Sequence, residues 1–167
     1  RDGRRWVMFS FFGGGLGGNP EGDGLNHGNA PISTATIPPV EILEAAYPVM
    51  FTRWALRADS GGPGRHRGGL GAVYELELLE EQADVFLFGE RGRFAPPGVV
   101  GGKAGALTTF SFPDGEARRS PPMVSKMVGI SIRRGDRLRL ETPGGGGYGD
   151  PRERSAEAVT RDLRLGY

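Results

Sequence analysis

The residues of this chain best suited to chemistry are Arg65, His66 and Arg67, which lie inside the glycine-rich run 59–71 (DSGGPGRHRGGLG). A guanidinium presents a rigid fork of N–H donors that matches the oxygens of a carboxylate or a phosphate. The three residues are therefore a candidate anion contact, and a solvated basic loop is the alternative interpretation. Glycine lets a backbone or a ligand approach closely, so the run predicts a loop of set shape.

A second candidate site is the loop that holds Asp23, Asn26 and His27. Carboxylate, amide and imidazole groups are ligands for divalent metals, and a loop histidine without ligand function is the alternative. The chain has two histidines, His27 and His66, which are too far apart for a paired-histidine motif on one helix. It has no cysteine, which excludes a disulfide framework and a thiolate metal site.

Another glycine run, 142–151 (TPGGGGYGDP), contains a G-x-G-x-x-G match between an expected strand and an expected helix. Its backbone amides would be able to hold an anion at the start of the helix, and a tight strand-to-helix connection is the alternative. An earlier match within 13–18 leads into Asn-Pro-Glu-Gly, which does not start a helix, so a dinucleotide fingerprint is rejected there. A Walker P-loop is absent from the sequence.

These loops must be positioned by strands, because alternating and apolar runs dominate the rest of the chain. Alternation predicts strands at 50–57 and 72–78, and the strand at 72–78 is expected to have one solvent-exposed face. The apolar runs 6–12 and 85–88 have strand length and are expected to be buried on both faces. Further expected strands are 107–112, 127–133 and 137–140, with a turn at 134–136.

Two short helices are expected. The first opens at Pro38-Pro39, carries an apolar stripe at Val40, Leu43 and Tyr47, and ends at Pro48. The second follows residues 150–153, where Asp, Pro and Glu occupy the N-cap, N1 and N3 positions. Its longer turn is capped by Ser155 and ends before Gly166. The predicted fold class is α+β, mainly antiparallel β with two short helices and glycine-rich loops.

The bulk composition limits the classes of partner. The chain has 167 residues, which fits one domain spanning 1–167. Its 21 basic and 20 acidic side chains nearly cancel, which gives no argument for nucleic acid or a membrane surface. No apolar stretch approaches the roughly 20 residues of a membrane helix. A cytoplasmic location is expected, and both ends are interpreted as cuts in a longer polypeptide.

The order of motifs resembles the C-terminal part of the hydantoinase B / 5-oxoprolinase family. The matching segments are 37–44 (IPPVEILE), 59–71, 89–91 (GER) and 142–151. Relatives in this family include the catalytic chains of acetone and acetophenone carboxylases. The resemblance extends over nearly the whole chain, and the DSGG and TPGGGGYGDP strings are its most specific parts.

The resemblance implies ATP-dependent opening of a cyclic amide, such as hydantoin, N-methylhydantoin or 5-oxoproline. A hydantoinase A-type subunit or domain would use ATP to phosphorylate the amide oxygen, and the B-type part would hydrolyse the activated intermediate in a hetero-oligomer. The carboxylase relatives couple similar activation to carbon dioxide addition. The resemblance implies a divalent metal ion and ATP for the full complex, and none for this chain alone.

Two hypotheses follow for the chain itself. As part of a cyclic-amide hydrolase, it would border the substrate with charged residues at the edges of its glycine loops, the arginines holding a carboxylate or phosphate. The candidate residues are Arg57, Asp59, Arg65, Arg67 and Arg91. As a β-rich scaffold, it would dock the partner subunit and leave the chemistry to residues upstream. The catalytic residues themselves are not identified by either hypothesis.

Overall fold

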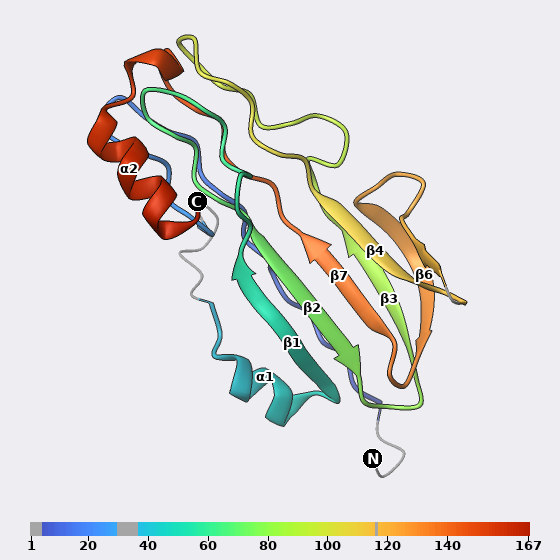
Figure 1. The fold of residues 1–167 in the computed structure, drawn as a ribbon. Coiled ribbons are helices and arrows are strands. Elements are labelled where there is room, and N and C mark those ends of the chain that lie inside the picture. Colours follow the sequence, from blue (N-terminus) through green and yellow to red (C-terminus); the bar gives the residue numbers. More distant parts are fainter. Residues whose placement is uncertain (1–4, 30–36, 116) are drawn as a thin grey trace.

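A computed structural model describes residues 5–29, 37–115 and 117–167. The described strands form two antiparallel sheets (Figure 1). The larger sheet contains, in spatial order, β1 (Val49–Leu56), β2 (Ala72–Leu78), β7 (Arg137–Glu141), β4 (Thr109–Asp114) and β5 (Ala117–Arg119). The smaller sheet pairs β3 (Gln82–Phe88) with β6 (Lys126–Arg133). The predicted α+β class with mainly antiparallel β content is confirmed.

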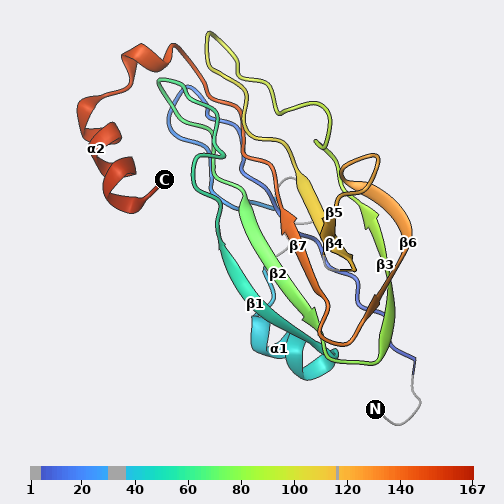
Figure 2. The same cartoon turned by 45° about the vertical axis from the view of Figure 1, so that its right-hand side comes forward.

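The main apolar core lies between the two sheets. Figures 1 and 2 show β3 and β6 beside and behind the larger sheet. Because side chains alternate across a strand, each sheet turns one apolar face inward. The buried core side chains are Leu78, Phe110, Phe112, Ile130 and Ile132.

The outward face of the larger sheet carries paired charges. Cross-strand register places Glu75 opposite Arg139 and Glu77 opposite Arg137. The Nε of Arg137 donates to Glu77 at 2.7 Å, and Arg139 contacts Glu75. The acidic and basic residues of β2 and β7 therefore form a partly solvated ladder of opposite charges, which stabilises strand pairing modestly.

The expectation that residues 85–88 are buried on both faces is wrong. Exposure alternates along β3, and Phe86 and Phe88 are 57% and 76% exposed. Val85 and Leu87 face the core instead. The reason is that β3 belongs to a two-stranded sheet whose outer face is covered by no other layer of the described residues.

The predicted strand at 6–12 is also wrong. The segment forms no strand in the described structure, and its exposure alternates. Trp6 packs against the core, whereas Val7, Phe9 and Phe11 are exposed. The short strand β5 was not anticipated from the sequence, because three exposed residues carry no pattern.

The two helices form where the capping residues predict them. Helix α1 (Val40–Ala46) follows Pro39 and buries Leu43. Residues 151–153 form a 3₁₀ turn, and Ser155 then caps α2 (Ala156–Leu165) by accepting a hydrogen bond from the Ala158 amide at 3.2 Å. Gly166 ends α2 with φ +69°. No described helix is both long and apolar enough to cross a bilayer.

Four glycine-rich segments run side by side beyond the strand ends of the larger sheet, and α2 lies along one side of them (Figures 1 and 2). We call residues 13–28, 60–71, 96–106 and 142–149 the glycine lobe. Backbone hydrogen bonds join these segments to one another, for example from Gly15 to Pro143 and from Gly62 to Gly145, both at 2.8 Å. The predicted loop of set shape is therefore part of a bundle of four loops.

Candidate functional site

The glycine lobe is held together by backbones in direct contact. A Cβ atom on Gly145 would lie 1.9 Å from the carbonyl oxygen of Leu16, and one on Gly144 would lie 1.7 Å from that of Ser60. Real Cβ atoms do not approach backbone so closely. The glycines are therefore required by packing, because only a residue without a side chain lets two backbones come this near.

The run 144–147 lies at the centre of the lobe. Its first and fourth glycines face residues 60–63, its second faces Leu16 and its third faces Pro97. The run is thus enclosed on three sides by three different segments. Four consecutive glycines are needed because each position lies against backbone atoms of a neighbouring segment.

Several amides of this run and of the residues that follow it are already hydrogen-bonded inside the lobe. Gly145 donates to Gly69 O, and Gly147 donates to Lys103 O, both at 2.9 Å. Tyr148 donates to His66 O, also at 2.9 Å. Because these amides are used in packing, the structure favours the tight connection of the alternative interpretation over an anion cradle.

Arg67 leaves the lobe and points toward α2. Its amide donates to Asp23 Oδ1 at 2.7 Å, and its Nη1 donates to Gly68 O at 2.6 Å and to Asn26 Oδ1 at 3.4 Å. Its Nε lies 3.4 Å from Asp162 Oδ2 on α2, and its side chain is 12% exposed. The guanidinium also lies 5.0 Å from the centre of the Tyr167 ring.

Arg154 also binds the carboxylates of Asp23 and Asp162. Its Nη1 and Nη2 donate to the two oxygens of Asp23 at 2.7 and 2.8 Å, and its Nη2 donates to Asp162 at 2.6 Å. Only 10% of its side chain is exposed. Arg161 adds a further bond to Asp23 at 3.0 Å. Helix α2 is therefore attached to the lobe by ion pairs.

This network lowers the pKa of Asp23. Burial alone acts to raise the pKa, because it disfavours the charged carboxylate. The hydrogen bonds from Arg154 and from the Arg67 amide, with the charges of both arginines, outweigh burial and hold the pKa of Asp23 at about 2. The carboxylate therefore stays ionised and paired throughout the neutral range.

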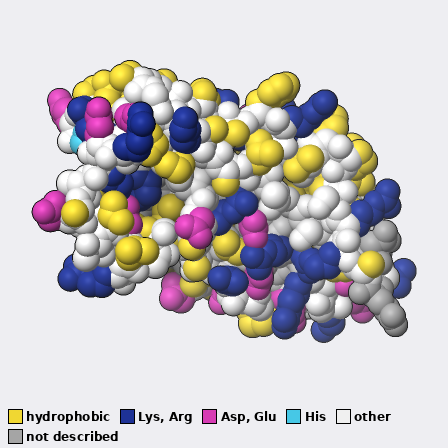
Figure 3. Space-filling model, turned by 45° about the horizontal axis from the view of Figure 1, so that its top comes forward, with side chains coloured by type: hydrophobic (Ala, Val, Ile, Leu, Met, Phe, Trp, Pro, Cys, Tyr) yellow, Lys and Arg dark blue, Asp and Glu magenta, His cyan; other side chains and the backbone are white. Residues whose placement is uncertain are grey.

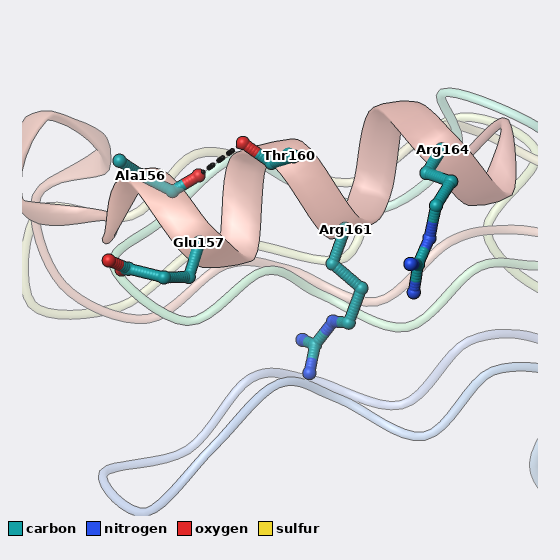
Figure 4. Close-up of a pocket in the computed structure, with 5 residues that line it drawn as sticks. All are labelled: Ala156, Glu157, Thr160, Arg161 and Arg164. Carbon is teal, nitrogen blue, oxygen red and sulfur yellow. Dashed lines mark hydrogen bonds between the residues drawn. The ribbon is translucent and has the colours of Figure 1, made fainter.

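A hollow of about 450 Å³ opens beside Arg67, between the 23–26 loop and the end of α2. Its polar lining includes Asn26, Arg67 and Arg161, and its apolar lining includes Leu165 and Tyr167. A second hollow, of about 360 Å³, borders α2 alone. Figure 4 shows Arg161 and Arg164 projecting from the same side of the helix toward the N-terminal segment.

Two buried polar atoms next to this hollow have no hydrogen-bond partner. They are Nε of Arg67 and Oδ1 of Asp162. Buried donors and acceptors are normally paired, so each exception requires a physical explanation. Both atoms belong to one ion pair at the junction between the lobe and α2, because Arg67 Nε lies 3.4 Å from the other oxygen of Asp162.

The other predicted site residues have different partners. Arg57 donates to the carbonyls of Leu107 and Thr142 at 2.7 and 3.1 Å, and lies 3.2 Å from Glu141. It therefore ties together the ends of β1 and β7 where the lobe begins. Arg65 lies 5.9 Å from the Tyr148 ring, on the outer side of the lobe.

Asp59 and Arg91 are exposed residues with φ of +56° and +61°. Such values are uncommon for residues with a side chain and mark strained loop positions. The Arg91 carbonyl accepts a hydrogen bond from Thr108, which fixes that loop. The five predicted residues are thus spread around the lobe rather than gathered at one point, and Arg67 is the one that lines a hollow.

The candidate metal ligands are engaged in other contacts. His27 Nε2 accepts a hydrogen bond from the Trp54 indole at 2.9 Å and lies 2.8 Å from the Tyr74 hydroxyl. Burial lowers the pKa of His27. Asp23 and Asn26 serve Arg67 and its neighbours. The described residues hold no cluster of three or more acidic or histidine side chains suited to a metal ion, so they do not fit the divalent metal that the resemblance implies.

Sequence reasoning missed Arg154, Arg161 and Asp162. Arg154 and its partner Asp23 lie 131 positions apart in the chain, and no spacing rule connects them. One signal of such an ion pair was present in the sequence. Asp162 places a charge on the side of α2 that packs against the lobe. A charge there requires a partner.

Comparison with known proteins decides the family. The model of the hydantoinase B/oxoprolinase family matches residues 1–151. The chain belongs to the hydantoinase B/oxoprolinase family. Among its relatives, the caprolactamase beta subunit of Pseudomonas jessenii is 38% identical over 137 residues, which cover 76% of this chain and 22% of that one. The 5-oxoprolinase 1 of Arabidopsis thaliana is 33% identical over 84% of this chain and 11% of its own length.

Solved structures agree with this assignment. ATP-dependent caprolactamase from Pseudomonas jessenii superposes on 92% of this hydantoinase B-family chain with a TM-score of 0.75 and 29% identity, and the match covers 27% of that chain. Acetone carboxylase matches 92% with a TM-score of 0.72 and 25% identity, covering 24% of its chain. The chain therefore spans about a quarter or less of the length of these relatives.

Proposed function

We propose that this chain is part of an ATP-dependent cyclic-amide hydrolase that opens a lactam or hydantoin ring together with a hydantoinase A-type partner. The observation that carries the proposal is the match to ATP-dependent caprolactamase in both sequence and fold. The name of the sequence relative, a beta subunit, supports a multi-subunit assembly.

The chemistry gives a reason for two components. An amide resists water because its resonance makes the carbonyl carbon a poor electrophile and the nitrogen a poor leaving group. Transfer of a phosphoryl group from ATP to the amide oxygen activates the carbon. Water then adds to it, and the ring C–N bond breaks as the nitrogen takes a proton, which leaves an acyl phosphate. A second water hydrolyses the acyl phosphate to a carboxylate and inorganic phosphate.

In this proposal ATP and a divalent metal ion are held outside the described residues. The amides of Gly145 and Gly147 at the centre of the lobe are already hydrogen-bonded, and the described acidic and histidine residues do not fit a metal. The chain contributes the substrate end of the site. Arg67 lines the hollow, and Arg57, Asp59, Arg65 and Arg91 border the lobe around it.

The test is an assay of the assembly formed with its A-type partner. Hydantoin, 5-oxoproline and caprolactam would each be incubated with and without ATP, and the ring-opened product and ADP would be measured. We expect product with at least one ring only when ATP is present. Arg67→Lys keeps the charge but removes the fork, and we expect it to lower turnover at least tenfold, whereas the exposed Arg133→Lys on β6 has no effect.

Two other functions are separated by the same assay. Ketone carboxylation is favoured by the match to acetone carboxylase, and it predicts ATP-dependent incorporation of bicarbonate into acetone with no ring opening. A non-catalytic scaffold is favoured by the dense ion pairing of Arg67. It predicts normal turnover for Arg67→Lys in an assembly that stays intact.

A further inference from the structure

Two apolar runs, 6–12 and 85–88, carry the pattern of strands that are buried on both faces. In the structure each run half-buries every second side chain and exposes the others. The exposed apolar side chains of these runs, with one neighbour on β6, are Val7, Phe9, Phe11, Phe86, Phe88 and Val128. Each is between 57% and 83% exposed. The sequence pattern therefore indicates a cover that the described residues do not provide.

The six side chains lie on one side of the molecule. Phe12 packs on Tyr74 of β2, with ring centres 4.5 Å apart. Trp6 packs on the core cluster that contains Leu78. Tyr74 and Leu78 are four positions apart in β2, so both point to the inner face of the larger sheet. Residues 6–12 therefore cover the same face as β3 and β6, and in Figures 1 and 2 the blue N-terminal segment passes behind β1 and β2. We call the six side chains the apolar face.

The opposite side of the molecule is charged. The outward face of the larger sheet carries the ladder of opposite charges on β2 and β7, and Figure 3, seen from this side, shows basic and acidic side chains next to one another. On the smaller sheet, polar pairs lie only at the margins of the apolar face. Ser131 donates to Asp84 at 2.6 Å before Phe86, and Lys126 donates to Glu90 at 2.5 Å beyond Phe88. An apolar centre with a polar rim is typical of a protein interface.

The apolar face also has the size of an interface core. An aromatic side chain carries about 150–250 Å² of surface, so the four phenylalanines together expose roughly 500 Å². The largest apolar patch of a typical monomeric protein measures about 300–600 Å², and a stable interface buries about 800 Å² on each partner. With its two valines, the apolar face therefore supplies most of what one interface requires.

The backbone of 6–12 is unpaired as well. Its side chains alternate in exposure as those of a strand do, yet no backbone hydrogen bond joins 6–12 to another part of residues 5–29, 37–115 and 117–167. The free N–H and C=O groups of an extended segment are a template for pairing with a further strand. The segment thus offers a strand edge and a row of apolar side chains to the same occupant.

The relatives indicate what that occupant is. The match covers 27% of the caprolactamase chain and 24% of the acetone carboxylase chain, so most of each of those chains lies outside it. We propose that the apolar face is covered by the part of a hydantoinase B-type polypeptide that lies outside residues 1–167, and that a strand of that part pairs with 6–12. A face without charges suits such an occupant, because permanent contacts are more apolar than transient ones. This assignment depends on the family and not on the ring that the assembly opens.

The test compares the same residues with and without the longer polypeptide. One protein is residues 1–167 alone. In the other, these residues replace the matching segment of the Pseudomonas jessenii caprolactamase beta subunit, which is 22% of that subunit. Hydrogen exchange of the 6–12 amides, followed by mass spectrometry, reports the strand pairing directly. If the altered subunit does not fold, the subunit without its own segment is added to residues 1–167, and the same amides are followed.

We expect the 6–12 amides of the short chain to exchange at the rate of an unstructured chain, and those of the long polypeptide at least 100-fold more slowly. The amides of β2, which has a strand on each side within this chain, should be protected in both. Rapid exchange of 6–12 in both proteins overturns the proposal. So does protection that requires dimerisation of the short chain, or addition of a hydantoinase A-type subunit, because a second copy or the partner subunit would then be the cover.

A second measurement tests the side chains. Phe9→Gln places a polar group on the apolar face. We expect it to leave the melting temperature of the short chain unchanged, because Phe9 is exposed there, and to lower that of the long polypeptide by several degrees. Arg53→Gln, at an exposed position of β1 opposite Glu75, is the control on the charged side and should change neither. An equal effect of Phe9→Gln in the two proteins would show that no layer covers this position.

Discussion

The two sheets with the core between them, which we call the sandwich, and the glycine lobe are stabilised in opposite ways. In the sandwich, large side chains such as Phe110 and Ile132 fill the space between two sheets. In the lobe, the run 144–147 has no side chains, and the carbonyls of neighbouring segments occupy the positions where Cβ atoms would be. The sandwich gains free energy by removing apolar surface from water. The lobe depends on backbone hydrogen bonds made at close range.

This difference determines how each region tolerates change. A side-chain core can repack around a smaller or differently shaped residue at moderate cost. A backbone bundle cannot, because the atoms that would have to move are carbonyls already bonded to a neighbour. The lobe is therefore a rigid support, and the Arg67 network with α2 is built on it.

The largest expected effect comes from one methyl group in the lobe. Gly145→Ala places a Cβ atom 1.9 Å from Leu16 O, and neither backbone can yield. We expect destabilisation of more than about 4 kcal/mol, measured by urea unfolding. The control is Gly22→Ala, where a Cβ meets nothing within 4 Å, and a change below about 1 kcal/mol is expected. Similar losses in the two variants would contradict the close-packed lobe.

The next largest effect is expected at the ionic junction. Arg154→Ala leaves Asp23 and Asp162 without their shared partner, and breaking a buried ion pair costs about 3 kcal/mol or more. The pKa of Asp23 should rise from about 2, which NMR titration of its carboxyl carbon would show. Arg152→Ala, whose side chain is 90% exposed, serves as the control and should change neither quantity. An unmoved pKa in Arg154→Ala would show that α2 is held by other contacts.

A smaller effect is expected in the sandwich. Ile132→Val removes one methylene from the buried core, which costs about 1 kcal/mol, because neighbouring side chains partly close the gap. Thermal unfolding is the measurement. The comparison with Gly145→Ala is informative because one variant removes a carbon atom and the other adds one. A loss for Ile132→Val as large as that for Gly145→Ala would remove the contrast between the two regions.

The smallest effect is a pH dependence at the contact between the lobe and the sandwich. His27 in the lobe accepts a hydrogen bond from Trp54 on β1, and burial lowers its pKa below 6.5 in the folded protein. As the pH falls, His27 therefore takes up a proton in the unfolded chain before it does so in the folded protein. The stability due to neutral His27 is complete above pH 6.5 and is lost as the pH falls toward the folded pKa.

His27→Gln should flatten the slope of stability against pH between 7 and 5. A slope that is unchanged in His27→Gln would contradict the assignment of this pH dependence to His27.

Local signals in the sequence predicted the elements well. Ser155 and Gly166 mark both ends of α2, and the alternation at 137–140 falls within β7. The family assignment from the motif order was also correct. Errors occurred where burial depends on whether another layer covers the strand, as at 85–88. An apolar run does not show whether both faces of a strand are covered.

The candidate site was predictable only in part. The glycine run around Arg67 indicated a shaped loop with a cation, and the hollow lies there. The partners on α2 were not predictable, because they meet Asp23 only after the chain has passed through every strand. A long-range ion pair leaves no local pattern in the sequence.

The glycine lobe is as rigid as the sandwich, although it lacks regular strands. Amide hydrogen exchange at Gly145 and Gly147, which donate to Gly69 O and Lys103 O, tests it most directly when compared with Tyr74 in β2. We expect protection of the glycine amides within about tenfold of that of the Tyr74 amide, because all of them would open only with global unfolding. Exchange of Gly145 and Gly147 at the rate of an unstructured loop, with Tyr74 still protected, would contradict it.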